Sequence, residues 1–169
     1  MSSHDADLAV VEALLGRVPR GRFQVVVRSD DGLPVVICNE PFLEDGSPMP
    51  TRYWLVGAEA CEAVSRIEAA GGVKAAEAAV SATSLAAAHR RYGEERDALI
   101  APSHEGPRPF GGVGGTRRGV KCLHAHYAWY LAGGDDPVGR WVSDRLSADD
   151  LPDPHLHVDR MFEDMREGR

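Results

Sequence analysis

The spacing of apolar residues predicts one helix at the start of the chain and a small sheet after it. Apolar residues recur at helical spacing over residues 8–15, and Gly16 favours a stop there. Residues 23–28, 35–40 and 52–57 are rich in the β-branched and aromatic residues typical of strands. The segment DDGLP between the first two supplies turn chemistry, so these two strands should form a hairpin. We therefore expect a small antiparallel sheet of about three strands.

Helical patterns follow the predicted strands, at residues 58–72, 73–102, about 120–131 and 135–147. The first of them ends at its glycine pair. The second is rich in alanine, with a break indicated near Ser81 or Gly93. The order of helix, strands and then helices predicts an α+β fold in a single domain, with helices covering one face of the sheet.

The chain divides by composition into two parts. Residues 1–134 form the predicted single α+β domain, and residues 135–169 form a short helix followed by a polar C-terminal arm. This arm carries three large apolar residues that could dock it on the body, on a second copy of the chain or on another protein: Met161, Phe162 and Met165.

Composition and charge narrow the classes of partner. The 169 residues carry a formal net charge of −7, which argues against a nucleic-acid-binding face and requires any phosphate site to be local. The acidic N-terminus is unlike a signal peptide, and no apolar run approaches the roughly 18 residues of a membrane span. Three scattered cysteines, Cys38, Cys61 and Cys122, are too few for a disulfide framework. We expect a cytoplasmic protein with free thiols and with neither nucleic acid nor membrane as partner.

One segment, PFGGVGGTRRGVKCLHAHYAWYLAGG, concentrates the candidate chemistry. Its glycine-rich part places Gly114 and Gly115 before Arg117, Arg118 and Lys121, at the predicted start of a helix. Backbone amides, the helix dipole and fork-shaped arginine donors together favour a bound phosphate or carboxylate. The segment is neither a Walker A sequence nor a dinucleotide-binding fingerprint. The alternative is a flexible surface loop with solvated arginines.

The same segment carries a cysteine and two histidines in KCLHAH. In a helix, Cys122 and His126 lie roughly 40° apart around the axis, whereas His124 points about 160° away from both. Only Cys122 and His126 could then chelate a metal, and they would need ligands from elsewhere, so no tightly bound zinc is expected. A position near a helix N-terminus and beside Lys121 favours the thiolate of Cys122, which makes Cys122, His124 and His126 candidate catalytic residues. The alternative is two boundary histidines and a half-buried thiol.

Two further segments carry polar or aromatic candidates. In PMPTRYW, Tyr53 and Trp54 must point to opposite faces of their strand, so one of them is expected in the core. Tyr53 is the candidate to line a ligand pocket, and packing of both rings in the core is the alternative. In AAAHRRYGEERDA, charges at helical i, i+4 spacing indicate a mostly solvated helix face, made by His89, Arg90, Arg91, Glu94, Glu95 and Arg96.

Several blocks together resemble an uncharacterised bacterial family, domain of unknown function 501. The blocks are LGRVPRG, GLPVV, PFLEDGSPMPTRYWL, SRIEAAGGV and GVKCLHAHYAWYLAGG, which cover most of residues 14–134 in order. The resemblance implies a small cytoplasmic protein of unassigned activity, whose genes often neighbour exopolyphosphatase-type and septum-formation genes. It also implies cysteine or histidine in many members where this chain has Ser29, Asp31 and Gly57, so a metal site built on those positions would be incomplete here.

Three functional hypotheses follow. The first is recognition of a small anionic, phosphorylated ligand by residues 111–121, with or without catalysis and without a cofactor. The second is a non-enzymatic interaction module related to cell division or the envelope. The third is a metal-binding domain that uses Cys122 and His126.

Overall fold

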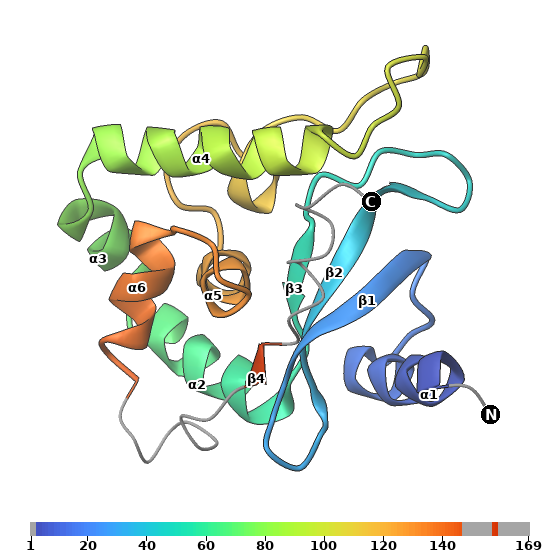
Figure 1. Ribbon diagram of the computed structural model, residues 1–169. Helices are drawn as coiled ribbons and strands as arrows, with labels where there is room; N and C mark the ends of the chain where they lie inside the picture. Colours follow the sequence, from blue (N-terminus) through green and yellow to red (C-terminus); the bar gives the residue numbers. More distant parts are fainter. Residues whose placement is uncertain (1–2, 147–156, 159–169) are drawn as a thin grey trace.

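The computed structural model describes residues 3–146 and 157–158, and Figure 1 shows a small sheet with helices on both sides. The sheet has the order β3-β2-β1-β4, and each neighbouring pair is antiparallel. Its strands are β1 (Gly21–Arg28), β2 (Pro34–Leu43), β3 (Tyr53–Leu55) and β4 (His157–Val158). The first three confirm the predicted antiparallel sheet. The two residues of β4 pair with β1, and the rest of the predicted C-terminal arm, with Met161, Phe162 and Met165, lies outside the described residues.

The helices confirm the α+β class. They are α1 (Ser3–Leu15), α2 (Ala58–Ala69), α3 (Gly72–Ala79), α4 (Ala82–Asp97), α5 (Leu123–Leu131) and α6 (Pro137–Ser143), with a short 3₁₀ turn, η1 (Val113–Gly115). The predicted break falls at Ser81, whose hydroxyl accepts a hydrogen bond from the amide of Ser84 at 3.1 Å and so caps α4. Gly93 lies inside α4. No helix in the described part of the chain is long and apolar enough to cross a membrane.

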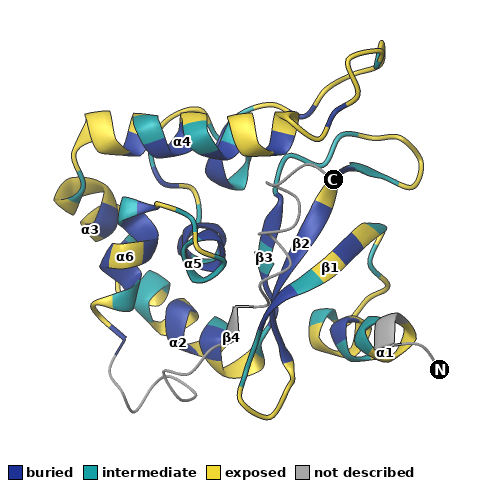
Figure 2. Cartoon of the chain, viewed as in Figure 1, coloured by how far each residue is buried: buried dark blue, intermediate teal, exposed yellow. Residues whose placement is uncertain are grey.

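Helices cover both faces of the sheet, because successive strand residues point to opposite sides. Val11 of α1 packs with Phe23, Ile37 and Val56 on one face. The other face carries residues such as Val36, which belong to the larger core beneath the remaining helices (Figures 1 and 2). The prediction of helices on a single face was therefore wrong for α1, which buries its own apolar stripe on the second face.

Helix α5 lies among α2, α6 and the edge strand β3, and it is buried on most sides (Figure 2). It begins at Leu123 and not, as predicted, near Val120. The later start has a tertiary cause, because carboxylates of other helices accept hydrogen bonds from the backbone amides at this point. Glu68 of α2 accepts from the amide of Leu123 at 2.6 Å, and Glu77 of α3 accepts from that of Val120 at 3.2 Å. Cys122 consequently stands just before the helix in an extended conformation, with φ −155°.

Candidate functional site

A cavity of about 280 Å³ lies where β3, the turn η1 and the start of α5 meet. Its lining brings together five residues that the sequence had singled out: Tyr53, Gly114, Lys121, Cys122 and His124. The remaining lining residues are Thr51, Trp54, Leu55 and Ala125. Segments some 70 residues apart in the chain thus converge on one hollow, which we call the Cys122 cavity.

The other predicted site residues are not part of this lining. Arg117 and Arg118 are exposed, and the Arg117 guanidinium lies over the ring of Phe110, 5.5 Å from its centroid. Gly115 lies against Pro50, where an added Cβ would stand 3.4 Å from the proline ring. Of the three predicted cationic side chains, only Lys121 reaches the cavity.

His126 has a structural position in the core. It is 1% exposed, and its Nδ1 donates a hydrogen bond to the Asp136 carboxylate at 2.7 Å. The other oxygen of Asp136 accepts from the amides of Val138 and Gly139, which caps α6. The alternative interpretation, in which His126 lies at the edge of the buried stripe of the helix, was wrong for this residue. Its pairing with Cys122 also required both residues in one helix, and Cys122 lies outside α5.

Two residues of this lining, Cys122 and His124, form a cluster with Glu68 of α2, which is not itself part of the lining. Cys122 Sγ lies 3.8 Å from Nδ1 of His124, and Oε1 of Glu68 lies 3.2 Å from the same nitrogen. Among the described residues, these three form a group that could hold a metal ion, with ligand atoms all within 4.8 Å of one another. The helical projection had set His124 apart from Cys122, and the extended backbone at Cys122 is what brings them together.

Polar contacts fix the orientation of the cluster. The Nε2 atom of His124 lies 3.2 Å from the carbonyl oxygen of Cys61 and 3.1 Å from the hydroxyl of Ser65. The hydrogen bond with the Cys122 thiol, helped by the charge of Glu68, raises the pKa of His124 to about 9 against the opposing effect of burial. Burial raises the pKa of Cys61 and brings that of Cys38 to about 11, so both of these thiols stay protonated at neutral pH.

The glycine-rich segment beside the cavity is held by internal hydrogen bonds. Six of its amides donate within the protein, those of Gly112, Val113, Gly115, Thr116, Arg118 and Val120. Val113 donates to Nδ1 of His89 at 3.1 Å, and Nε2 of that histidine then donates to the carbonyl of Gly119 at 3.0 Å. Because these donors are satisfied internally, the segment is a folded wall of the site rather than an open ring of amides.

The face of α4 that touches this segment is buried, so the prediction of a mostly solvated face was wrong for part of this group. His89, Tyr92 and Arg96 are 6%, 0% and 2% exposed, and they follow one another at i, i+3 and i+7. The Arg96 guanidinium donates to the carbonyls of Gly111 at 3.0 Å and of Pro50 at 3.2 Å. Arg90 and Glu94 are exposed as expected. The i, i+3, i+7 spacing of these residues was the sequence signal for a buried face. The charged residue types indicated a solvated face instead.

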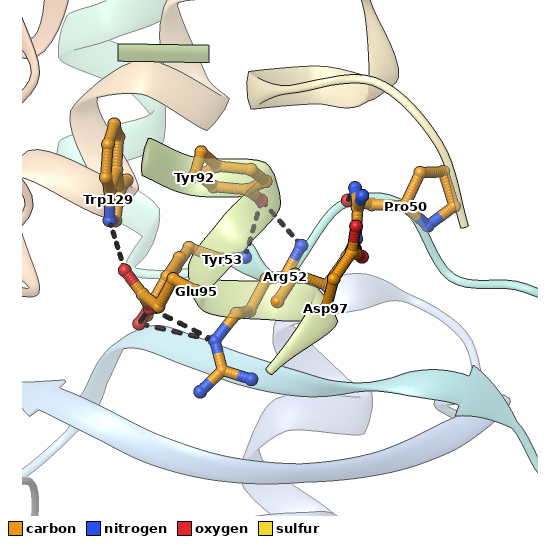
Figure 3. Close-up of polar contacts among 8 residues, drawn as sticks. Pro50, Arg52, Tyr53, Tyr92, Glu95, Asp97 and Trp129 are labelled. Atoms are coloured by element: carbon orange, nitrogen blue, oxygen red, sulfur yellow. Dashed lines mark hydrogen bonds and ion pairs between the residues drawn. The ribbon is translucent and has the colours of Figure 1, made fainter. Parts of the chain in front are cut away.

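A polar network holds the side chain of Tyr53 (Figure 3). Its hydroxyl donates to Oε1 of Glu95, which also accepts from Nε of Arg52 at 3.2 Å. Oε2 of Glu95 accepts from the indole of Trp129 at 3.2 Å. The hydroxyl of Tyr92 accepts from the amides of Arg52, at 2.6 Å, and of Tyr53, at 3.3 Å. Burial raises the pKa of Tyr53 well above its usual value, so its phenol stays neutral.

The positions at which the resemblance implied cysteine or histidine lie around a second cavity. Ser29, Asp31 and Gly57 line a hollow of about 380 Å³ between α1, the β1–β2 turn and the start of α2. The lining of this hollow includes neither Cys122 nor His124.

Comparisons with known proteins agree with the resemblance. No curated protein and no solved structure matched the chain. A family model described as "protein of unknown function (DUF501)" matches residues 25–144, from within β1 to the end of α6. This match includes every residue of the Cys122 cavity and covers most of the chain, which therefore belongs to the DUF501 family.

Proposed function

We propose that the protein binds a small anionic ligand in the Cys122 cavity. The observation that carries this proposal is the convergence of Tyr53, Gly114, Lys121, Cys122 and His124 on one hollow. These residues come from a strand, a 3₁₀ turn and a helix start, and the glycine-rich wall between them is held in shape by His89 and Arg96. A preformed hollow with a few convergent polar groups is the usual form of a small-molecule site.

The charge of the ligand is argued from its surroundings. Lys121 provides a cation in the lining, in a chain whose formal net charge is −7. The cavity also lies at the N-terminal end of α5, where the helix dipole favours negative charge. Leu55 and Ala125 add apolar walls, beside which a charge-assisted hydrogen bond is stronger than in open water. The size, about 280 Å³, suits a ligand as small as a phosphorylated metabolite.

A comparison of two single substitutions tests the proposal. The parent protein, Lys121→Gln and Arg118→Gln would each be titrated calorimetrically with the phosphorylated compound that most raises the melting temperature of the parent. Arg118 is the matched control because it lies three residues from Lys121, is exposed, and is not in the lining.

We expect Lys121→Gln to weaken binding at least about tenfold, since one charge-assisted hydrogen bond is worth about 1.5–3 kcal/mol and about 1.4 kcal/mol gives that factor. Arg118→Gln should bind as the parent does. Unchanged affinity in Lys121→Gln, or a loss of affinity confined to Arg118→Gln, would show that the ligand binds outside the Cys122 cavity and would refute the proposal.

A further inference from the structure

Glu68 and two lining residues of the Cys122 cavity, Cys122 and His124, converge on one point. Cys122 Sγ and Glu68 Oε1 both face Nδ1 of His124, at 3.8 and 3.2 Å. We propose that Glu68, Cys122 and His124 bind a zinc ion, with a fourth coordination position open to the cavity. This inference goes beyond the proposed ligand and does not depend on it.

The spacing of the donor atoms matches a tetrahedral zinc site. Zinc binds thiolate sulfur at about 2.3 Å and imidazole nitrogen or carboxylate oxygen at about 2.0–2.2 Å, so neighbouring ligand atoms stand about 3.3–3.6 Å apart. The observed separations of 3.8 Å and 3.2 Å bracket this range. The third pair, Cys122 Sγ and Glu68 Oε1, lies within 4.8 Å, so seating the ion also draws these two atoms together.

The same geometry is unlike a nucleophilic triad. In such a triad the nucleophile and the orienting acid face different nitrogens of the histidine, so that a proton can be taken at one nitrogen while the other is held. Here the thiol and the carboxylate face one nitrogen, and the second nitrogen faces the backbone carbonyl of Cys61 at 3.2 Å. Three donors around a common point are what a metal ion requires.

The surrounding contacts orient the ligands as in known metal centres. A metal-bound histidine almost always donates its other N–H to a carbonyl or carboxylate, and Nε2 of His124 has the Cys61 carbonyl in that place. This contact keeps a hydrogen on Nε2, so Nδ1 is the nitrogen that gives up its proton and coordinates when the metal binds. Glu68 is fixed by the amide of Leu123, which donates to its Oε1 at 2.6 Å. That oxygen has a second lone pair for the ion.

An open fourth position distinguishes this arrangement from a purely structural zinc site. Structural zinc is closed by four protein ligands, whereas catalytic zinc has three and keeps one position for water or substrate. The nearby Cys61 thiol is engaged elsewhere, since its Sγ donates to the carbonyl of Leu55 at 3.2 Å. Cys122 and His124 both line the cavity, so an incoming ligand can reach the ion from there.

The test uses the full-length protein after chelator treatment, with no anionic ligand present. Zinc binding is measured by competition with a chromophoric chelator, and cobalt(II) is substituted to record its spectrum. The ligand variants are Glu68→Gln, Cys122→Ser and His124→Gln. Gln at position 68 can still accept from the Leu123 amide, so the start of α5 is kept. Cys61→Ser and His104→Gln are matched controls that change a thiol and an imidazole outside the cluster.

We expect one equivalent of zinc to bind, and each ligand variant to weaken binding at least about tenfold while the controls bind as the parent does. Cobalt should give a thiolate-to-metal absorption band that Cys122→Ser removes and Cys61→Ser keeps. Substoichiometric zinc in the parent, an effect of Cys61→Ser equal to that of Cys122→Ser, or a cobalt spectrum without thiolate would overturn the inference. The Lys121 comparison with a phosphorylated compound is a separate experiment, so either proposal can fail without the other.

Discussion

Replacing Arg96 by methionine should destabilise the protein strongly, because this buried side chain binds the glycine-rich segment to the connection between β2 and β3. Its guanidinium is 2% exposed and donates to the carbonyls of Gly111 at 3.0 Å and Pro50 at 3.2 Å, with longer contacts to Phe110 and Pro109, and its Nε donates to Asp97 at 2.9 Å. Methionine fills similar space without any donor, so the cavity left behind is small and the lost hydrogen bonds dominate.

The magnitude follows from the two short bonds to backbone carbonyls, because the ion pair with Asp97 involves a half-exposed carboxylate and contributes little. A hydrogen bond from a charged group contributes about 1.5–3 kcal/mol, and a buried carbonyl left without a donor costs about 1–3 kcal/mol. These terms overlap, so we expect the free energy of unfolding of Arg96→Met to fall by about 3–5 kcal/mol. Arg90→Met makes the same chemical change at an exposed position of the same helix and should stay within about 0.5 kcal/mol of the parent.

Urea unfolding of the parent and both variants measures these differences by linear extrapolation. The test also bears on the cavity, since Gly114 of the tied segment lines it. If the free energy of unfolding of Arg96→Met fell by less than about 1 kcal/mol, the glycine-rich segment would not depend on the hydrogen bonds of Arg96. The account of how α4 shapes the site would then be refuted.

Two further predictions concern the contact between α4 and the glycine-rich segment. Gly112→Ala should cost about 1–3 kcal/mol, because an added Cβ would stand 2.5 Å from Cβ of His89 and force the backbone apart. Gly93→Ala should be neutral or stabilising in the same urea assay, since its Cβ would meet only contacts of 3.4 Å or more inside a helix, and equal losses in the two variants would contradict this reasoning. Burial lowers the pKa of His89, so this histidine binds a proton more readily in the unfolded chain than in the folded protein. The stability from neutral His89 should therefore be complete above about pH 6.5 and decline as the pH falls below it. His89→Gln should flatten this decline between pH 7.5 and 5.5, and an unchanged slope would show that other groups cause it.

Local patterns were enough to predict most of the fold. The strands and the break at Ser81 follow from β-branched runs, turn residues and a capping serine, which act within a few residues of one another. The position of α1 on the second face of the sheet could not be obtained this way, because amphipathic spacing identifies a buried stripe but not the surface that buries it.

The candidate site was predicted in part. The sequence singled out Cys122 and His124 but placed them on opposite sides of a helix, since the start of α5 was set too early. That start depends on Glu68, which lies more than 50 residues earlier in the chain and caps Leu123 only in the folded protein. The same carboxylate completes the three-donor cluster, so one long-range contact explains both differences.

Arg96 illustrates a different limit. Its helical spacing from Tyr92 and His89 places all three on one face, yet a charged residue is normally read as solvated. Burial became favourable only because loop carbonyls at Pro50 and Gly111 converge on the guanidinium. No local pattern in the sequence encodes that convergence.

The location of a bound anion tests the central claim most directly. Crystals of the metal-free protein would be soaked in tungstate, a heavy analogue of phosphate, and anomalous scattering would locate the tungsten. The account predicts a peak inside the Cys122 cavity, with tungstate oxygens about 2.7–3.2 Å from Nζ of Lys121. A peak confined to the exposed guanidinium groups of Arg117 and Arg118, with an empty cavity, would contradict it.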